Sequence, residues 1–197
     1  MDYVICVLLT VVFMACAIFA DIKFKILNKK LLYLPILILI GFSNYVMLFL
    51  KDMDLYFVIT QSAMQLLLLL LSFWDIKDME IPIVFIYIFA FICAIMMLIN
   101  PYCKLINCVI LGVVIAIVLL VFYKVKKSSV GIGDIEVIIA LSFAYGYPHI
   151  FNVLFTALFI SMLYGIGLLI LKKAKIKTEI PFLPFLFLSV SLNIINF

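Results

Sequence analysis

Long apolar segments alternate with short polar ones along nearly the whole chain. About twenty consecutive apolar residues make a helix long enough to cross a bilayer, so each segment is a candidate transmembrane helix. The pattern predicts eight such spans, at residues 3–20, 31–50, 55–74, 82–99, 108–123, 134–145, 151–171 and 181–195. The sixth span is short because Gly146, Tyr147 and Pro148 interrupt it. We therefore expect an all-α, polytopic integral membrane protein with about eight transmembrane helices, forming a single helical domain over residues 1–197.

Polar residues inside the third span indicate where it meets other helices. Gln61, Ser62 and Gln65 should face neighbouring helices rather than lipid, because an unpaired polar group in hydrocarbon is unfavourable. The leucine run at residues 66–71 shows no heptad pattern, so we expect it to face lipid rather than to form a zipper.

The composition agrees with a chain that is solvated by lipid. Of the 197 residues, 70% are hydrophobic and 12% are charged, whereas about a quarter of the residues in a soluble domain are charged. The net charge of +4 comes from lysines divided among short loops, so no nucleic-acid surface is expected. The single histidine and the lack of a Cys-x-x-Cys pair predict no metal site. Cys103 and Cys108 share one loop region, and the sequence leaves open whether they form a disulfide.

The lysines also predict the orientation of the chain in the membrane. Twelve of the fourteen lysines lie in four loops on one side, at residues 21–30, 75–81, 124–134 and 172–179. The loops on the other side contain only Lys51 and Lys104. Since lysine-rich loops remain in the cytoplasm, we expect a multi-pass plasma-membrane protein with both termini outside.

Two aspartates at the cytoplasmic ends of predicted spans are candidates for catalysis. Asp75 follows the third span, and Asp134 begins the sixth span after Gly131 and Gly133, which allow close approach of another chain. A carboxylate at a membrane boundary is unfavourable unless it is paired, solvated or used. Aspartyl hydrolysis uses such a pair, with one carboxylate as the base toward water and the other polarising the scissile carbonyl. Asp21 ends the first span in the same way and is the alternative to Asp75.

Three motifs in this order resemble those of the type IV leader peptidases, or prepilin peptidases, which are GxGD-type membrane aspartyl proteases. The motifs are Asp75 with Ile81-Pro82, then Gly131-Ile132-Gly133-Asp134, then Glu179-Ile180-Pro181-Phe182-Leu183-Pro184-Phe185-Leu186. The resemblance covers roughly residues 55–190, the expected peptidase-like core. It implies an aspartic endopeptidase that needs no metal or cofactor, with Asp75 and Asp134 as the catalytic pair. The supporting residues would be Ile81, Pro82, Gly131, Gly133, Pro181, Phe182 and Pro184.

The resemblance also implies a substrate. The family cleaves the short basic leader of type IV prepilins and related pseudopilins at the cytoplasmic membrane face. Asp78, Glu80, Glu136 and Glu179 are expected on that face and could receive the leader. Glu136 stands where many members have lysine, and Leu183 stands where the late motif usually has glycine. N-methyltransferase activity is not predicted, because the cytoplasmic Cys-x-x-Cys loop associated with it is absent.

Two other interpretations remain open. The first is a non-enzymatic membrane carrier, or an inactive assembly factor derived from the family. A carrier needs polar residues in the middle of its spans, whereas these carboxylates lie at span ends. The second is a presenilin-like intramembrane protease, which shares GxGD but would hold its aspartates deeper in the bilayer. The expected partners are a prepilin or pseudopilin substrate and the lipid bilayer, and no oligomeric state is predicted.

Overall fold

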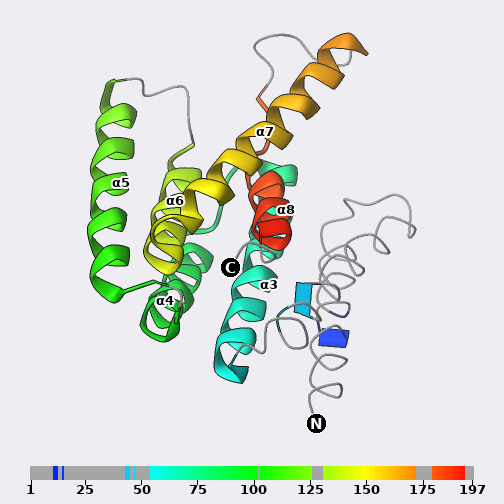
Figure 1. The fold of residues 1–197 in the computed structure, drawn as a ribbon. Coiled ribbons are helices and arrows are strands. Elements are labelled where there is room, and N and C mark those ends of the chain that lie inside the picture. The colour runs from blue at the N-terminus through cyan, green and yellow to red at the C-terminus, as the bar shows by residue number, and fades with distance from the viewer. Residues whose placement is uncertain are drawn as a thin grey trace.

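The structure is a computed structural model that describes residues 54–101, 103–125, 131–171 and 179–193, with six isolated residues before them. Apart from those six residues, the first two predicted spans lie outside the described residues, and so does Asp21. Within the described residues the chain has six helices and no strand (Figure 1). The helices are α3 (Leu55–Asp78), α4 (Ile83–Ile99), α5 (Leu105–Val125), α6 (Ile132–Tyr145), α7 (His149–Ile170) and α8 (Leu183–Asn193).

The described helices confirm a membrane protein with an all-α fold. By length and composition, α3, α5 and α7 can each cross a membrane, and α4 and α8 are shorter apolar helices. The six helices correspond to the last six predicted spans. Because the first two spans fall outside the described residues, the count of eight stays a prediction.

The end of α3 differs from the prediction and changes the setting of Asp75. The third span was expected to end at Trp74, with Asp75 in a loop, but α3 continues to Asp78. Met79 then adopts the left-handed conformation with φ 52°, and its N–H donates to the carbonyl oxygen of Asp75 at 3.2 Å. This is a common way to close the last turn of a helix. Asp75 is therefore held on a helix rather than on a loop.

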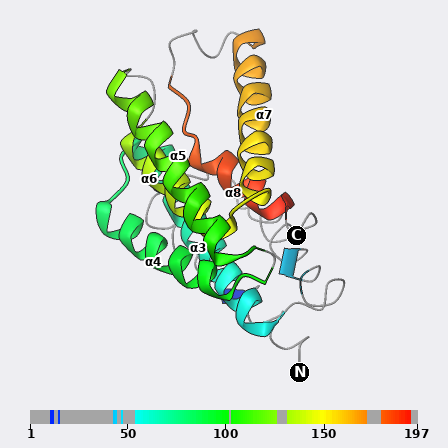
Figure 2. The ribbon, with the colours of Figure 1, turned by 60° about the vertical axis from the view of Figure 1, so that its left-hand side comes forward.

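The bundle is organised around α3 and α6. The α3 helix packs against α4 and α8, while α6 packs against α4 and α5. Figure 2 shows α7 and α8 on one side of the bundle, with α4, α5 and α6 on the other. The α7 helix is buried only in its first half, through Ile150, Val153 and Ala157. Many apolar side chains of its second half are exposed, among them Met162, Leu163 and Ile170.

The prediction that the leucine run faces lipid is wrong. Leu68 and Leu71 are fully buried, and Leu69 is 3% exposed. In the most apolar part of α3, 56% of the residues are buried, against 11% in α5. The leucine run itself is apolar on all sides, as α5 is, so its hydropathy does not show that it lies in the centre of the bundle. The contacts of α3 with α4 and α8 account for the burial.

The polar residues of α3 are buried, as predicted. Gln61, Ser62 and Gln65 are each at most 1% exposed. The Ser62 hydroxyl donates to Asn44 Oδ1 at 3.0 Å, and Gln61 is bonded to Tyr145 of α6. These hydrogen bonds between helices satisfy polar groups that have no water to bind in the bilayer core.

Candidate active site

Asp75 is bound by the late motif of the chain. Its side chain is 6% exposed, and its Oδ2 atom accepts a hydrogen bond of 3.0 Å from the backbone N–H of Leu183. Leu183 is the first residue of α8, so its N–H has no partner within the helix. The amino end of a helix also carries a partial positive charge that favours an anion. The beginning of α8 thus positions the Asp75 carboxyl group and stabilises its negative charge.

Asp134 lies in the first turn of α6 and faces Asp75. The two carboxyl groups are close enough for their charges to repel each other directly. Asp134 Oδ1 is buried, and within the described residues it has no hydrogen-bond partner. A side chain at Gly131 would approach Asp134 Oδ2 to 3.3 Å, which is tighter than an ordinary contact. Glycine at residue 131 therefore leaves room around the Asp134 carboxyl group.

Gly133 brings the second motif against the first. A Cβ atom at this position would lie 2.8 Å from Ile81 Cδ1, so Ile81 packs directly on the backbone at the start of α6. Pro82 follows as the N-cap residue of α4, with φ −63°. The three motifs, which are far apart in the sequence, therefore meet at one end of the bundle.

A second contact fixes α3 and α6 relative to each other. Gln61 Nε2 donates to the Tyr145 hydroxyl at 2.7 Å, and that hydroxyl donates to Gln61 Oε1 at 3.0 Å. At 1.5 Å per residue, Gln61 lies about 21 Å along α3 from Asp75, and Tyr145 lies about 16 Å along α6 from Asp134. The two helices therefore run antiparallel, with the aspartates at one end and this hydrogen-bonded pair near the other. Sequence reasoning placed Gln61 at a helix contact but did not identify Tyr145.

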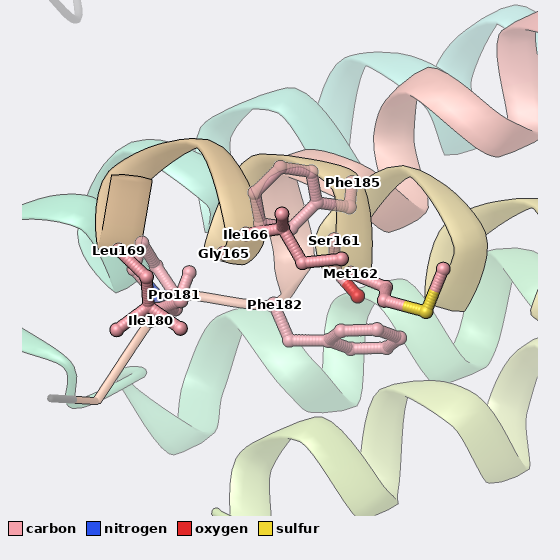
Figure 3. Close-up of a pocket in the computed structure, with 9 residues that line it drawn as sticks. All are labelled: Ser161, Met162, Gly165, Ile166, Leu169, Ile180, Pro181, Phe182 and Phe185. Atoms are coloured by element: carbon pink, nitrogen blue, oxygen red, sulfur yellow. The ribbon is translucent and has the colours of Figure 1, made fainter. Parts of the chain in front are cut away.

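The late motif also forms one wall of an apolar groove beside Asp75. Figure 3 shows Ile180, Pro181 and Phe182 opposite Gly165 and other residues of α7. The groove has a volume of about 360 Å³. Phe182, which lines it, directly precedes the residue that binds Asp75. The groove therefore lies next to the segment that binds Asp75.

Exposed acidic side chains surround this end of the bundle. Asp78 and Glu80 are at the end of α3, Glu136 is near the start of α6, and Glu179 precedes α8. Asp78 pairs with Lys77 over 3.9 Å, and both side chains are nearly half exposed. Such an exposed pair contributes little to stability. The four acidic residues are therefore available to a positively charged ligand.

The comparisons with known proteins identify the family of the chain. The model of the type IV leader peptidase family matches residues 62–166, which is more than half of the chain and includes Asp75, Ile81 and Asp134. Curated proteins and solved structures give no match. The late motif lies beyond the matched residues, and its link to the other two motifs is the bond between Leu183 and Asp75. The chain belongs to the type IV leader peptidase family.

Proposed function

We propose that the chain is a membrane aspartyl endopeptidase that removes the leader peptide of type IV prepilins or related pseudopilins. The observation that carries the proposal is the meeting of Asp75 and Asp134, from two different helices, at one end of the bundle. Membership of a peptidase family supports a protease. Two carboxyl groups whose charges repel each other do not both ionise readily and hold one proton between them, as acid and base catalysis by an aspartyl pair requires.

The surroundings of the two carboxyl groups suggest different roles. Asp75 accepts the Leu183 N–H at the start of α8, which favours its carboxylate form. Asp134 Oδ1 is buried without a partner among the described residues, and this favours a protonated carboxyl group. We therefore assign Asp75 as the base that takes a proton from the attacking water. Asp134 gives its proton to the scissile carbonyl oxygen as the water oxygen bonds to the carbonyl carbon. The C–N bond then breaks, the proton held by Asp75 passes to the leaving nitrogen, and a hydroxyl proton of the intermediate returns to Asp134.

The substrate follows from the surfaces around the pair. The exposed carboxylates of Asp78, Glu80, Glu136 and Glu179 would attract a basic leader. The apolar groove lined by Phe182 would receive the apolar segment that follows the cleavage site. With the leader at one side of the aspartates and the apolar segment at the other, the scissile bond would lie between Asp75 and Asp134.

The proposed orientation places this site at the cytoplasmic face of the plasma membrane. Lys77 lies in the last turn of α3 and Lys124 in the last turn of α5, while Lys104 precedes the first turn of α5. Two of the three described lysines therefore lie at the end of the bundle that carries the aspartates. Lysine-rich loops stay inside, which supports a cytoplasmic site and termini that face outside.

The test is hydrolysis by the purified full-length chain in liposomes, with a prepilin from the same genome as the substrate. The expected result is release of the basic leader, with a mass that places the cut just before the apolar segment. A cut within the apolar segment would favour the presenilin-like alternative. If the chain is folded and several different prepilins all remain uncleaved, the result would favour the carrier or the inactive assembly factor.

A further inference from the structure

Two cysteine thiols meet at the end of the described bundle that is opposite the aspartates. Cys103 is 8% exposed and Cys108 is fully buried, and both are free thiols. A Cβ atom built on Gly146 would lie 2.7 Å from Cys108 Sγ and would clash with Cys103 Sγ as well. Both sulfur atoms therefore lie next to the position that a methyl group on Gly146 would occupy. The two thiols interact directly.

The start of α5 explains why these two side chains meet. The carbonyl oxygen of Lys104 accepts the N–H of Asn107 at 2.8 Å and the N–H of Cys108 at 3.2 Å. Lys104 is therefore the N-cap residue of a helix that begins at Leu105. Cys103 precedes the cap and Cys108 is the fourth helical residue, which are the two positions whose side chains touch in a hydrophobic staple. The contact between the thiols thus follows from the local backbone.

Gly146 provides the space for both sulfur atoms. It ends α6 with φ 61°, a conformation that favours glycine, and it has no side chain to displace the thiols. Cys103 Sγ also lies 3.8 Å from the carbonyl oxygen of Tyr147. The thiol pair is therefore enclosed between the start of α5 and the turn from α6 to α7.

We propose that Cys103 and Cys108 form an intramolecular disulfide that closes the start of α5 over Gly146. The oxidant is a small external disulfide. The Cys103 thiolate attacks one of its sulfur atoms, which forms a mixed disulfide and releases one thiol. The Cys108 thiolate then attacks the Cys103 sulfur and releases the second thiol. Each protein thiol loses its proton, and the external disulfide is reduced to two thiols.

The location of the pair supports a stable disulfide. The lysine distribution orients Lys104 and its neighbours away from the cytoplasm. Disulfides persist in oxidising compartments outside the cytoplasm, whereas cytoplasmic thiols are kept reduced. Cys103 retains some exposure beside Tyr147, which is 62% exposed, so the first exchange step can begin there.

Cys93 provides a matched control within the same chain. It is 1% exposed, and its Sγ lies 3.7 Å from Met64 Sδ rather than beside a described cysteine. It should therefore remain a thiol under conditions that oxidise Cys103 and Cys108.

The experiment uses the full-length protein in membranes, incubated with oxidised glutathione, quenched with acid, denatured and alkylated with N-ethylmaleimide. Trypsin cleaves after Lys104, which separates Cys103 from Cys108. We expect mass spectrometry to find the peptide 78–104 joined to the peptide 105–124, with the loss of two hydrogens, until a reductant is added. Fragmentation should place the link at Cys103. Cys108→Ser should abolish the joined pair, and Cys93→Ser should retain it.

Three results would overturn the proposal. One is recovery of the two peptides as separate species, with N-ethylmaleimide on both cysteines. Another is glutathione retained on Cys103 or Cys108, which would mean that the second exchange step does not occur. The third is a link from Cys93 at the same yield as from Cys103.

Discussion

Replacing Gly133 with alanine would push a methyl group into the side chain of Ile81. The new Cβ would lie 2.8 Å from Ile81 Cδ1, which is closer than real Cβ contacts. Overpacking of this kind destabilises a protein by about 1–3 kcal/mol, and the flexible end of Ile81 favours the lower part of that range. In a helix interior, alanine is more stable than glycine by about 1 kcal/mol, and Gly133, as the second residue of α6, gains at most this amount. The two effects nearly cancel, so Gly133→Ala alone is expected to change the free energy of unfolding only slightly.

A second substitution, Ile81→Val, separates these two effects because valine lacks the Cδ1 atom. The other Ile81 atoms near the new Cβ lie at 3.5 Å, which is ordinary contact. In the Ile81→Val background, Gly133→Ala should therefore show only the gain in helix stability. That gain is common to both backgrounds. The effect of Gly133→Ala on the free energy of unfolding therefore differs between the two backgrounds only by the clash. We expect a coupling free energy of about 1 kcal/mol.

The assay is unfolding of the four proteins in mixed micelles with increasing sodium dodecyl sulfate, followed by circular dichroism. The cleavage rate provides a second measurement, because the contact lies next to Asp134. A loss of about 1 kcal/mol in transition-state stabilisation corresponds to about a fivefold lower kcat/KM. We expect this lower kcat/KM for Gly133→Ala only when Ile81 is present. Equal effects of Gly133→Ala in both backgrounds would refute the packing of Ile81 on α6.

Three further predictions follow from the site. Tyr145→Phe leaves the buried Gln61 amide without its partner. We therefore expect the free energy of unfolding to fall by about 1–3 kcal/mol in the same assay. Leu183→Pro removes the N–H that binds Asp75 but remains compatible with the first position of α8. A hydrogen bond to a charged group contributes about 1.5–3 kcal/mol, so the cleavage rate should fall about tenfold or more. Glu80→Lys should slow cleavage of a prepilin with a basic leader by about twofold to fivefold, which is the scale of an exposed charge contact.

Each of these substitutions has a matched control. Leu183→Ala keeps the N–H, and an equal loss of cleavage in this variant would show that the side chain is responsible. The double variant Gln61→Leu with Tyr145→Phe removes both polar partners and should recover stability; a further loss would contradict the pairing. A leader with its lysines replaced by alanine should be cleaved at the same rate by wild type and Glu80→Lys. A slower rate for the variant with that leader would contradict a charge contact.

Hydropathy predicted much of the architecture because apolar length is a strong constraint on a membrane chain, whereas the orientation drawn from the lysine counts stays a prediction. Apolar length locates the spans, and the six described helices occur where the pattern predicts them. Neither signal reports which helix lies at the centre of the bundle, so the leucines of α3 were wrongly assigned to lipid. The end of α3 was also missed, because the left-handed turn at Met79 has no glycine to mark it.

The sequence proposed which residues form the candidate site but did not predict their contacts. Asp75 and Asp134 were expected at the same membrane face, and the structure places them together. The bond between Leu183 and Asp75 was not foreseen, because it involves a backbone N–H that any residue other than proline would supply. The contact between Gly133 and Ile81 depends on helix packing, which spacing along one sequence does not encode.

The measurement that tests the central claim most directly is prepilin cleavage in cells that co-express the substrate with wild type, Asp75→Asn, Asp134→Asn or Asp21→Asn. Asparagine keeps the size of the side chain but cannot take or give the required proton. With all four proteins present at equal levels in the membrane, we predict no processing by Asp75→Asn or Asp134→Asn and normal processing by Asp21→Asn. Normal processing by Asp75→Asn, together with an inactive Asp21→Asn, would contradict the assignment of the catalytic pair.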